Sequence, residues 1–453
     1  MSPAVSLFSL IGKHVQESGL EVIWICESKI PLYKYNLTLD GTVYFYTQHK
    51  KIDCDATGST KLMFSNFDRD SELGLQRDHS HYNADRAKDL LCFFSQLHEM
   101  HKFDGILYEN VSNGFSYCAY TVSEQKNFKY FGLIGSRLPG RYEIWEKPFG
   151  ISEEIEANIA GELNPESSSF AEDYIKNKKK PDYMKNNPTG FAYSYLTHYL
   201  KKIKFLRDFL KTASSRDVLK ESRRAFQSHH PLVDSTIRLK RNILRKIKLP
   251  LIQNKYKKPD PSENYFLYPL HYHPESSTSV LSPCYVDEIN TIKNIAFNLP
   301  LNTILYIKDH PNAAGFKPYT FYTELSSIPN TRLISYNENT LFLIKKSQGV
   351  ITLTSTIGFE ALLEGIPVYA LGDVFYSNHP LCTKIKDFRD LPDAIEKKIL
   401  PEKEDIKKYN TTYVAAYYKA TYPGTFTLET NTKASQTLIK NICNAIIYRL
   451  SAT

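Results

Sequence analysis

The sequence predicts an α/β protein with two Rossmann-like domains, and two observations support this prediction. Short β-branched or aromatic runs alternate with segments whose apolar residues recur at helical spacing, which is typical of a parallel sheet covered by helices. The alternation occurs twice, and a lysine- and arginine-rich segment separates the two regions. We therefore expect one domain at 1–150, a basic and mainly helical connecting segment at 151–260, a second domain at 261–425, and a C-terminal helix at 426–453 that packs back on the first domain.

Composition excludes several classes of protein. The 453 residues are 42% hydrophobic and 23% charged, as in a soluble globular chain of more than one domain. No apolar run approaches the roughly 20 residues of a membrane helix, and the start MSPAVSLFSLIGKHVQESG lacks the basic region of a signal peptide. Seven scattered cysteines without a CxxC pair predict neither a disulfide framework nor a structural zinc site. A reducing cytoplasm and no bound metal are the expectations that follow.

The first region alternates predicted strands and helices. Strands are expected at 20–26, 42–46, 103–108 and 130–134. Helices are expected at 85–101 and 116–125. This alternation predicts a mostly parallel sheet covered on both faces.

Three charged side chains follow strands of the first region. Glu109 directly follows the strand at 103–108, whereas Arg137 and Arg141 lie in the loop after the strand at 130–134. Ligands of parallel sheets bind beyond the carboxyl ends of the strands. A carboxylate there can act as a general base, a nucleophile or a ligand of sugar hydroxyls, and arginines hold phosphate or carboxylate groups. The alternative for Glu109 is a solvated strand end or an ion-pair partner of one arginine.

The net charge of +8 concentrates in the connecting segment, between about Lys176 and Lys258. Lysines cluster at 176–188, and a long cationic helical stretch opens near Ser194. In the segment 237–258, cations alternate with apolar residues along one side, namely Leu239, Ile243, Leu244, Ile247 and Leu249. This pattern fits an anionic membrane surface or lipid-linked substrate, or a solvated linker whose apolar stripe packs on its own domain. No nucleic-acid-binding motif accompanies the charge, so nucleic acid is not an expected partner.

The second region repeats the alternation more regularly. Strands are expected at 266–270, 303–307, 332–335, 350–353 and 368–371. Helices are expected at 285–298, 319–327, 340–346 and 359–364, and farther on at 391–399 and 435–450. The pattern again predicts a Rossmann-like domain, although it loosens beyond Asp373.

A hydroxyl-rich turn joins a strand to a helix in this second region. Thr354, Ser355 and Thr356 follow the strand at 350–353, and Gly358 precedes the helix. Small hydroxyls and backbone N–H groups at a helix N-terminus form a ready site for phosphate. The alternative is a helix cap that binds nothing, because Ser and Thr are ordinary N-cap residues.

Other strand ends of the second domain should meet this turn at one edge of the sheet. They contribute cationic, imidazole or carboxylate groups, namely His271, His273, Glu275, Lys308 and His310. Such a set suits an anionic nucleotide. Glu360, in the first turn of the helix, either accepts from a ribose hydroxyl or only complements the helix dipole. Neither GxGxxG nor GxxxxGK[ST] is present, which disfavours a nicotinamide enzyme and a P-loop nucleotidase.

The second domain contains three motifs, KDHP at 308–311, TSTIGFEA at 354–361 and GIPV at 365–368. At this spacing they resemble the capsule polysaccharide biosynthesis family, which consists of GT-B glycosyltransferases and includes retaining β-Kdo transferases. The stretch YPLHYHPESSTS at 268–279, and in the first domain Tyr108–Asn110 with the loop 136–141, are similar to surface-carbohydrate proteins of the same group. The resemblance covers both Rossmann-like domains but not the basic middle.

The resemblance implies a GT-B-like fold, with two domains facing a cleft, and a metal-independent transferase. Its co-substrate would be a nucleotide-sugar, CMP-Kdo-like or other, with no further cofactor. Lys308 and His310 would bind the nucleotide, Ser355 and Thr356 would contact its phosphate, and Glu109 would be the catalytic carboxylate. The first domain would take a glycan or lipid-linked glycan acceptor, with Arg137 and Arg141 as further contacts. We expect a cytoplasmic protein, peripheral at the inner face of the membrane.

Two other functions remain open from the sequence. A nucleotide-sugar 2-epimerase shares the double-Rossmann layout and would convert its substrate without an acceptor. A non-catalytic component of a polysaccharide assembly complex would retain the fold but bind no nucleotide. Product analysis and nucleotide binding distinguish these alternatives from a transferase.

Overall fold

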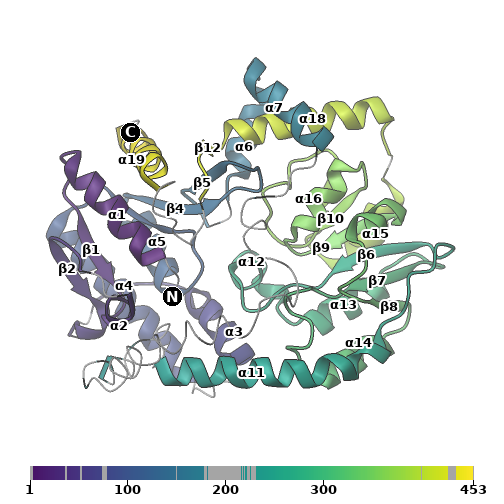
Figure 1. Ribbon diagram of the computed structural model, residues 1–453, viewed down its shortest axis with the longest axis horizontal. Coiled ribbons are helices and arrows are strands. Elements are labelled where there is room, and N and C mark those ends of the chain that lie inside the picture. Colours follow the sequence, from purple (N-terminus) through teal and green to yellow (C-terminus); the bar gives the residue numbers. More distant parts are fainter. Residues whose placement is uncertain are drawn as a thin grey trace. The chain divides into compact units, whose positions relative to one another are not determined.

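The computed structural model describes most of the chain and divides it into two units (Figure 1). Unit 1 comprises Met1–Lys147, Lys180–Leu239 and Thr421–Thr453, and unit 2 comprises Pro148–Lys179 and Lys240–Ala420. The described residues are 4–35, 38–50, 54–73, 79–148, 150–177, 231–398, 400–426 and 435–451, with the single positions Pro181, Arg216, Val218, Lys220, Glu221 and Ala225. The lysines that follow Asn177 in the predicted cluster at 176–188 lie outside these residues, as does most of the helical stretch predicted from near Ser194.

Unit 2 contains a six-stranded parallel sheet in the order β11-β10-β9-β6-β7-β8. Read from β8, this is the strand order 3-2-1-4-5-6 of a Rossmann fold. The strands are β6 Tyr265–Pro269, β7 Ile304–Lys308, β8 Thr331–Ile334, β9 Gly349–Thr352, β10 Val368–Ala370 and β11 Cys382–Lys384. The α/β prediction for this domain is therefore confirmed.

Burial explains why the strands of unit 2 have continuous apolar sequences. All five residues of β6 and all four of β9 are buried, because helices cover both faces of a parallel sheet. The crossover helices are α12 Ser276–Ser279, α13 Glu288–Phe297, α14 Tyr319–Ser327, α15 Thr340–Lys346 and α16 Thr356–Leu363, followed by α17 Leu391–Glu396. The predicted elements between 265 and 371 are present, with bounds shifted by at most three residues.

The two ends of unit 2 pack together through helices that the sequence analysis left unassigned. These are α6 Ser152–Ala160, α7 Pro165–Asn177 and α18 Lys403–Lys419 (Figure 1). The Tyr418 hydroxyl donates to Glu166 at 2.6 Å, and its ring centroid lies 4.5 Å from that of Phe170. Residues 148–179 thus pack with unit 2, so the predicted connecting segment 151–260 is not one separate element.

Most of the segment 237–258, in which cations alternate with apolar residues, lies in the long helix α11, Pro231–Ile252 (Figure 1). Leu249 and Ile252 are buried in the core of unit 2, and Arg245 donates to the carbonyls of Ala314 and Pro311 at 2.8 and 3.0 Å. Leu249 therefore does not share the exposed side of the helix with Ile243 and Ile247, contrary to the predicted stripe. None of the described helices is both long and apolar enough to cross a membrane.

Unit 1 contains a four-stranded sheet in the order β12-β5-β4-β3 and a parallel pair, β1 with β2. The strands are β1 Ile23–Cys26, β2 Thr42–Phe45, β3 Gly105–Glu109, β4 Lys129–Gly135, β5 Arg141–Trp145 and β12 Tyr422–Pro423. β3 and β4 are parallel, but β5 returns antiparallel to β4, and β12 is antiparallel to β5. The prediction of a mostly parallel sheet is wrong here because residues 136–140 form a hairpin turn, with Gly140 at φ 71°.

Helices from the first 126 residues and one helix near the end of the chain cover the core of unit 1. They are α1 Ala4–Glu17, α2 Ile30–Tyr35, α3 Phe64–Leu73, α4 His79–His101, α5 Gly114–Lys126 and α19 Ser435–Ser451. Leu7 and Ile11 of α1 share a buried cluster with Ile442 and Ile446 of α19 and with Leu133 of β4.

A disulfide in unit 1 corrects one sequence prediction. Cys54 and Cys92 are bonded, with their Cα atoms 5.8 Å apart. The two residues are 38 positions apart in the chain, and Cys92 lies within α4. Only the packing of the preceding segment against this helix brings them together, so their spacing in the sequence did not indicate the bond.

Candidate functional site

Three loops of unit 2 open onto one edge of the sheet because they follow adjacent parallel strands. β6 lies between β7 and β9, so the carboxyl ends of all three point the same way. The strand order changes direction between β6 and β9, which is where open α/β sheets bind ligands. The predicted residues lie at or just after these ends: His271, His273 and Glu275 at β6, Lys308 and His310 at β7, and Thr354, Ser355 and Thr356 at β9.

The turn before α16 is held by its own hydroxyl groups. Ser355 is the N-cap of α16, and its Oγ accepts from the Ile357 N–H at 3.2 Å. The Ser355 N–H in turn donates to Thr352 Oγ1 at 3.1 Å. Because Ser355 Oγ accepts this bond, its proton is able to donate to a ligand oxygen. Thr356 is the first residue of the helix, where a backbone N–H has no carbonyl partner within the helix.

Thr354 differs from Ser355 and Thr356 because its hydroxyl and its backbone N–H both donate to groups of the protein. Its hydroxyl donates to the Ser277 carbonyl at 2.8 Å, and its backbone N–H donates to His271 Nε2 at 3.3 Å. The turn therefore offers phosphate the donors of Ser355 and Thr356. Thr354 instead ties the turn to the loop after β6.

Packing explains the glycine at position 358. A Cβ on Gly358 would overlap the hydroxyl and ring of Tyr376. That hydroxyl donates to the Ser355 carbonyl at 2.6 Å and so holds the same turn. Gly358 thus supports the turn by allowing Tyr376 to approach.

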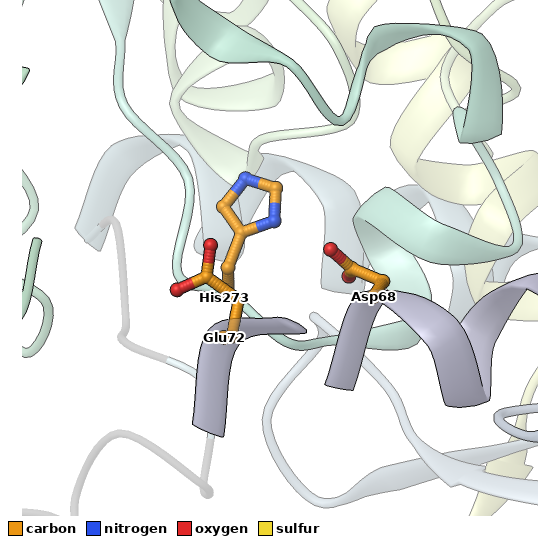
Figure 2. Close-up of side chains that lie close together, drawn as sticks. All are labelled: Asp68, Glu72 and His273. Carbon is orange, nitrogen blue, oxygen red and sulfur yellow. The ribbon is translucent and has the colours of Figure 1, made fainter. Parts of the chain in front are cut away.

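A buried carboxylate lies beneath the loop after β6. Glu288 is the first residue of α13, and only 4% of it is exposed. The His271 N–H donates to Glu288 Oε1 at 2.9 Å, and His271 Nδ1 lies 3.5 Å from the same oxygen. His273 Nε2 lies 3.5 Å from Oε2; His273 is drawn in Figure 2. Burial alone would raise the pKa of Glu288, but hydrogen bonding to the two imidazoles lowers it below its ordinary value.

Lys308 ends β7 as a largely buried cation. Its Nζ donates to the Tyr336 carbonyl at 3.2 Å. Burial lowers the pKa of Lys308, and the nearby charges of Asp309, Glu338 and Glu360 oppose this effect. α16 begins at Thr356, so Glu360 lies beyond the first turn in which it was predicted. Its exposed carboxylate acts electrostatically on the cation at the neighbouring strand end.

His310 presents one nitrogen as a donor. Its Nδ1 accepts from the Asn312 N–H at 3.2 Å, so the neutral ring carries its proton on Nε2. Burial, reinforced by His271 and Lys308, lowers the pKa of His310 to about 4. Asp309 is held by the Tyr256 hydroxyl at 2.6 Å and by the His310 N–H at 2.7 Å, and burial raises its pKa to about 6.

Glu275 has a mainly structural place in the same loop. It is the N-cap residue of α12, and its carbonyl accepts from the Thr278 and Ser279 hydroxyls at 3.0 and 2.9 Å. Its carboxylate accepts from the Ser277 hydroxyl at 3.1 Å.

Glu109, the predicted catalytic carboxylate, lies in unit 1 at the end of β3. Its Oε1 accepts from the Ser112 hydroxyl at 3.4 Å, and its carbonyl accepts from the Tyr130 hydroxyl at 2.9 Å. Burial raises the pKa of Glu109, and the charge of Arg69 opposes this. A carboxyl group that retains its proton above the usual range is suited to general acid–base chemistry.

The structure separates the two arginines that were predicted in one loop. Arg141 begins β5, and its guanidinium donates to the Thr421 hydroxyl at 2.9 Å and to the Thr421 carbonyl. Arg141 therefore fastens the C-terminal segment to β5. Arg137 lies within the turn between β4 and β5 and is partly exposed.

Unit 1 also carries two acidic residues on α3. Asp68 and Glu72 are four residues apart, so their carboxylates leave the same side of the helix (Figure 2). Asp68 is buried, and Glu72 is partly buried.

Sequence analysis did not include Glu288, Asp309 and Thr352 among the site residues. An acid in the first turn of a helix is ordinary, so Glu288 gave no signal of its own. Asp309 belongs to the KDHP motif and could have been singled out there. Thr352 closes a buried strand, and only the hydrogen bond to Ser355 distinguishes it.

Comparison with known proteins gives a match to one family over the segment that contains the site. Residues 219–400 match the family described as "Capsule polysaccharide biosynthesis protein". This match confirms the resemblance predicted from the motifs. No curated protein matches the chain.

Several solved structures match the chain at low sequence identity and low TM-score. "Thermosulfurimonas dismutans KpsC, beta Kdo 2,7 transferase" is 15% identical, with a TM-score of 0.34, over 78% of this chain and 89% of that chain. The beta Kdo 2,4 transferase of the same KpsC is 15% identical, with a TM-score of 0.38, over 77% and 88%. UDP-GlcNAc 2-epimerase from Methanocaldococcus jannaschii is 12% identical, with a TM-score of 0.25, over 98% of each chain. Likeness at this level does not transfer an activity.

Proposed function

We propose that this protein is a glycosyltransferase of surface or capsular polysaccharide biosynthesis that uses a nucleotide-sugar donor. The observation that carries the proposal is the group of donors at the switch point of unit 2, within a segment of the capsule polysaccharide biosynthesis family. Ser355 and Thr356 offer a hydroxyl and a helix N-terminus, and Lys308 and His310 end the neighbouring strand. Such donors match the diphosphate or phosphate of a nucleotide-sugar.

The chemistry of the leaving group explains why these residues suffice for the donor side. Transfer joins an acceptor oxygen to the anomeric carbon and breaks the bond from that carbon to a phosphate oxygen. The acceptor hydroxyl gives its proton to a base, and negative charge develops on the departing nucleotide. Fixed donors at a helix N-terminus and a nearby cation stabilise that charge as it develops. We therefore propose a GT-B-type, metal-independent reaction in which Glu109 serves as the catalytic carboxylate.

A binding and activity screen tests the proposal. Purified chain would be titrated with CMP, UDP and GDP by calorimetry and then assayed with the matching sugar nucleotides, with and without a lipid-linked glycan acceptor. His310→Ala is expected to weaken nucleotide binding about tenfold, because a hydrogen bond to a charged group is worth about 1.5–3 kcal/mol. Lys293→Ala, at an exposed ion pair with Glu324, is the control and should bind normally.

Each outcome of this screen has a definite meaning. Binding of one nucleotide, weakened by His310→Ala only, together with acceptor-dependent release of nucleotide, supports a transferase. Conversion of a nucleotide-sugar without any acceptor would instead indicate a 2-epimerase. Failure of all three nucleotides to bind would reject the donor site and favour a non-catalytic role.

We further propose that α11 brings the protein to an anionic membrane surface. Ile243, Ile247 and Leu251 recur every four residues, share one face and are 50%, 57% and 54% exposed. No acidic residue occurs from 235 to 259, whereas nine lysines and arginines do. An exposed apolar face flanked by cations is the pattern by which interfacial helices bind anionic lipid.

Vesicle sedimentation tests this second proposal. The protein is expected to sediment with phosphatidylglycerol vesicles at low salt, and less at high salt, but not with phosphatidylcholine vesicles. Ile243→Ser with Ile247→Ser should weaken binding at least about tenfold, since each buried isoleucine contributes about 1.5–3 kcal/mol. Phe297→Ser, at an 88% exposed residue outside α11, is the matched control. Absence of binding at low salt would contradict the proposal.

A further inference from the structure

We infer that Glu288 is a positioning residue of the donor site. It fixes the imidazole of His271 so that His271 holds the backbone of the turn entering α16. The inference rests on the proposed nucleotide site of unit 2 and adds a residue that lies on none of its three loops. Glu288 belongs to α13, and it reaches the loop after β6 from below.

The first step of the argument is the surroundings of the carboxylate. Glu288 is buried, and its two oxygens face the two imidazoles of one loop: Oε1 lies 3.5 Å from His271 Nδ1, and Oε2 lies 3.5 Å from His273 Nε2. A buried carboxylate is costly unless hydrogen-bond donors satisfy it. The His271 N–H supplies one donor at 2.9 Å, and the ring N–H groups are placed to supply the others.

The second step concerns the other nitrogen of His271. The Thr354 backbone N–H donates to Nε2 at 3.3 Å, so this nitrogen must present a lone pair. In a neutral ring the proton then belongs on Nδ1, which faces Glu288. The opposite tautomer would place N–H against N–H at Thr354 and a lone pair against the carboxylate. Glu288 therefore selects the tautomer that Thr354 requires.

The third step is the place of this contact in the fold. His271 follows β6 and Thr354 follows β9, so the bond crosses the switch point between the two strands. The Thr354 hydroxyl makes a second link, to the Ser277 carbonyl on the β6 side. Together these bonds hold Ser355 and Thr356, the next residues in the chain, in their position at the start of α16. Loss of the tautomer would release one of the two links.

Nucleotide affinity and the tautomer of His271 test this inference together. Glu288→Leu removes the acceptor while filling the volume, and we expect nucleotide affinity to fall about tenfold. Glu288→Gln retains one acceptor oxygen for His271 and should restore most of the affinity. Glu324→Leu, at an exposed residue paired with α13, is the matched control and should bind like the wild type. The probe is whichever of CMP, UDP and GDP the wild type binds.

Nitrogen NMR of histidine-labelled protein reads the tautomer directly, without ligand. The wild-type His271 signal, assigned by its absence in His271→Asn, should show the proton on Nδ1, and Glu288→Leu should shift it toward Nε2. His271→Asn has no atom at the position of Nε2 to accept from the Thr354 N–H, so it should weaken nucleotide binding as Glu288→Leu does. Since both substitutions act through the same hydrogen bond, the double variant should bind nucleotide no more weakly than either single variant.

The outcomes separate this inference from the proposed function. If no nucleotide binds the wild type, the donor site is rejected and the positioning role is rejected with it. If nucleotides bind the wild type and Glu288→Leu equally, or the tautomer of His271 is unchanged, only the role of Glu288 is overturned. Additive losses in the double variant would likewise show that Glu288 does not act through His271.

Discussion

At the residue scale, the hydroxyl groups before α16 differ in what they can donate. Thr354 gives its proton to the Ser277 carbonyl, whereas Ser355 accepts from Ile357 and keeps its proton for a ligand. His310 likewise has a defined donor, because Asn312 engages its Nδ1. The hydrogen bonds within the protein thus assign a structural role to some residues and leave others able to bind.

Glu109 provides a prediction that separates catalysis from folding. If it is the acid–base carboxyl group, Glu109→Gln should reduce sugar transfer about 10²–10⁴-fold while nucleotide affinity is unchanged. The measurement is the turnover rate together with calorimetric titration of the nucleotide. A transfer rate within a few fold of the wild type would contradict the assignment.

The stability of the wild type should depend on pH in a way that Glu109→Gln removes. Burial raises the pKa of Glu109, so the folded state binds the proton more tightly than the unfolded state. Wild-type stability should therefore fall as the pH rises from the ordinary carboxyl pKa through the raised pKa. Glu109→Gln has no such proton and should lose that part of the fall, which urea unfolding at acidic and neutral pH would show.

Gly358 gives a second prediction at the residue scale. An added Cβ overlaps Tyr376, whose hydroxyl holds the Ser355 carbonyl. Gly358→Ala should therefore destabilise unit 2 by about 1–3 kcal/mol, as overpacking does. In a Tyr376→Phe background, where the overlapping hydroxyl is absent, the added cost should be smaller. Equal costs in both backgrounds, measured by urea unfolding, would show that this contact is not the cause.

At the scale of the element, α11 has two faces with opposite roles. Leu249 and Ile252 are buried in the core of unit 2, and Lys248 donates to the carbonyls of Phe316 and Lys317, both at 2.8 Å. Ile243, Ile247 and Leu251 lie on the exposed face. The helix is thus anchored by a face that carries both apolar and cationic residues, while a second apolar face remains exposed. An ordinary surface helix has a single apolar face and buries it.

A matched pair of substitutions tests the two faces. Leu249→Ala should destabilise unit 2 by about 2–5 kcal/mol, because it leaves a cavity in the core. Ile247→Ala, on the exposed face, should change stability by no more than about 0.5 kcal/mol. Urea unfolding measures both. A similar loss for the two variants would mean that another part of the protein covers Ile247, and the proposed membrane face would be wrong.

At the scale of the whole molecule, the chain distributes its structural and candidate functional features between two units. The disulfide Cys54–Cys92 lies within unit 1, and the candidate nucleotide site lies within unit 2. Reduction should therefore destabilise unit 1 by about 2–4 kcal/mol through the loop that it opens, while the nucleotide affinity of unit 2 is unchanged. Thermal unfolding and calorimetry with and without dithiothreitol measure the two effects.

The control for this prediction is the double variant Cys54→Ser with Cys92→Ser. It should resemble the reduced wild type, and dithiothreitol should have no further effect on it. If the reduced wild type bound nucleotide more weakly than the oxidised wild type, the two units would be coupled.

Much of unit 2 follows from the sequence because its signals are local. Buried parallel strands require continuous apolar runs such as residues 349–352, and N-cap residues such as Ser355 indicate where a helix begins. Unit 1 was less predictable because β5 follows β4 through a hairpin whose residues, 136–140, do not differ in type from those of a strand–helix loop.

By itself the sequence determined the alternation of strands and helices, the family motifs, and the three strand ends of the candidate site. Tertiary structure alone decided the partners: Glu288 beneath His271, Cys92 beside Cys54, and Thr421 on Arg141. The physical reason is the range of the forces involved. Periodicity and capping act over a few neighbouring residues, whereas these contacts join positions from 17 to 280 residues apart, which only folding brings together.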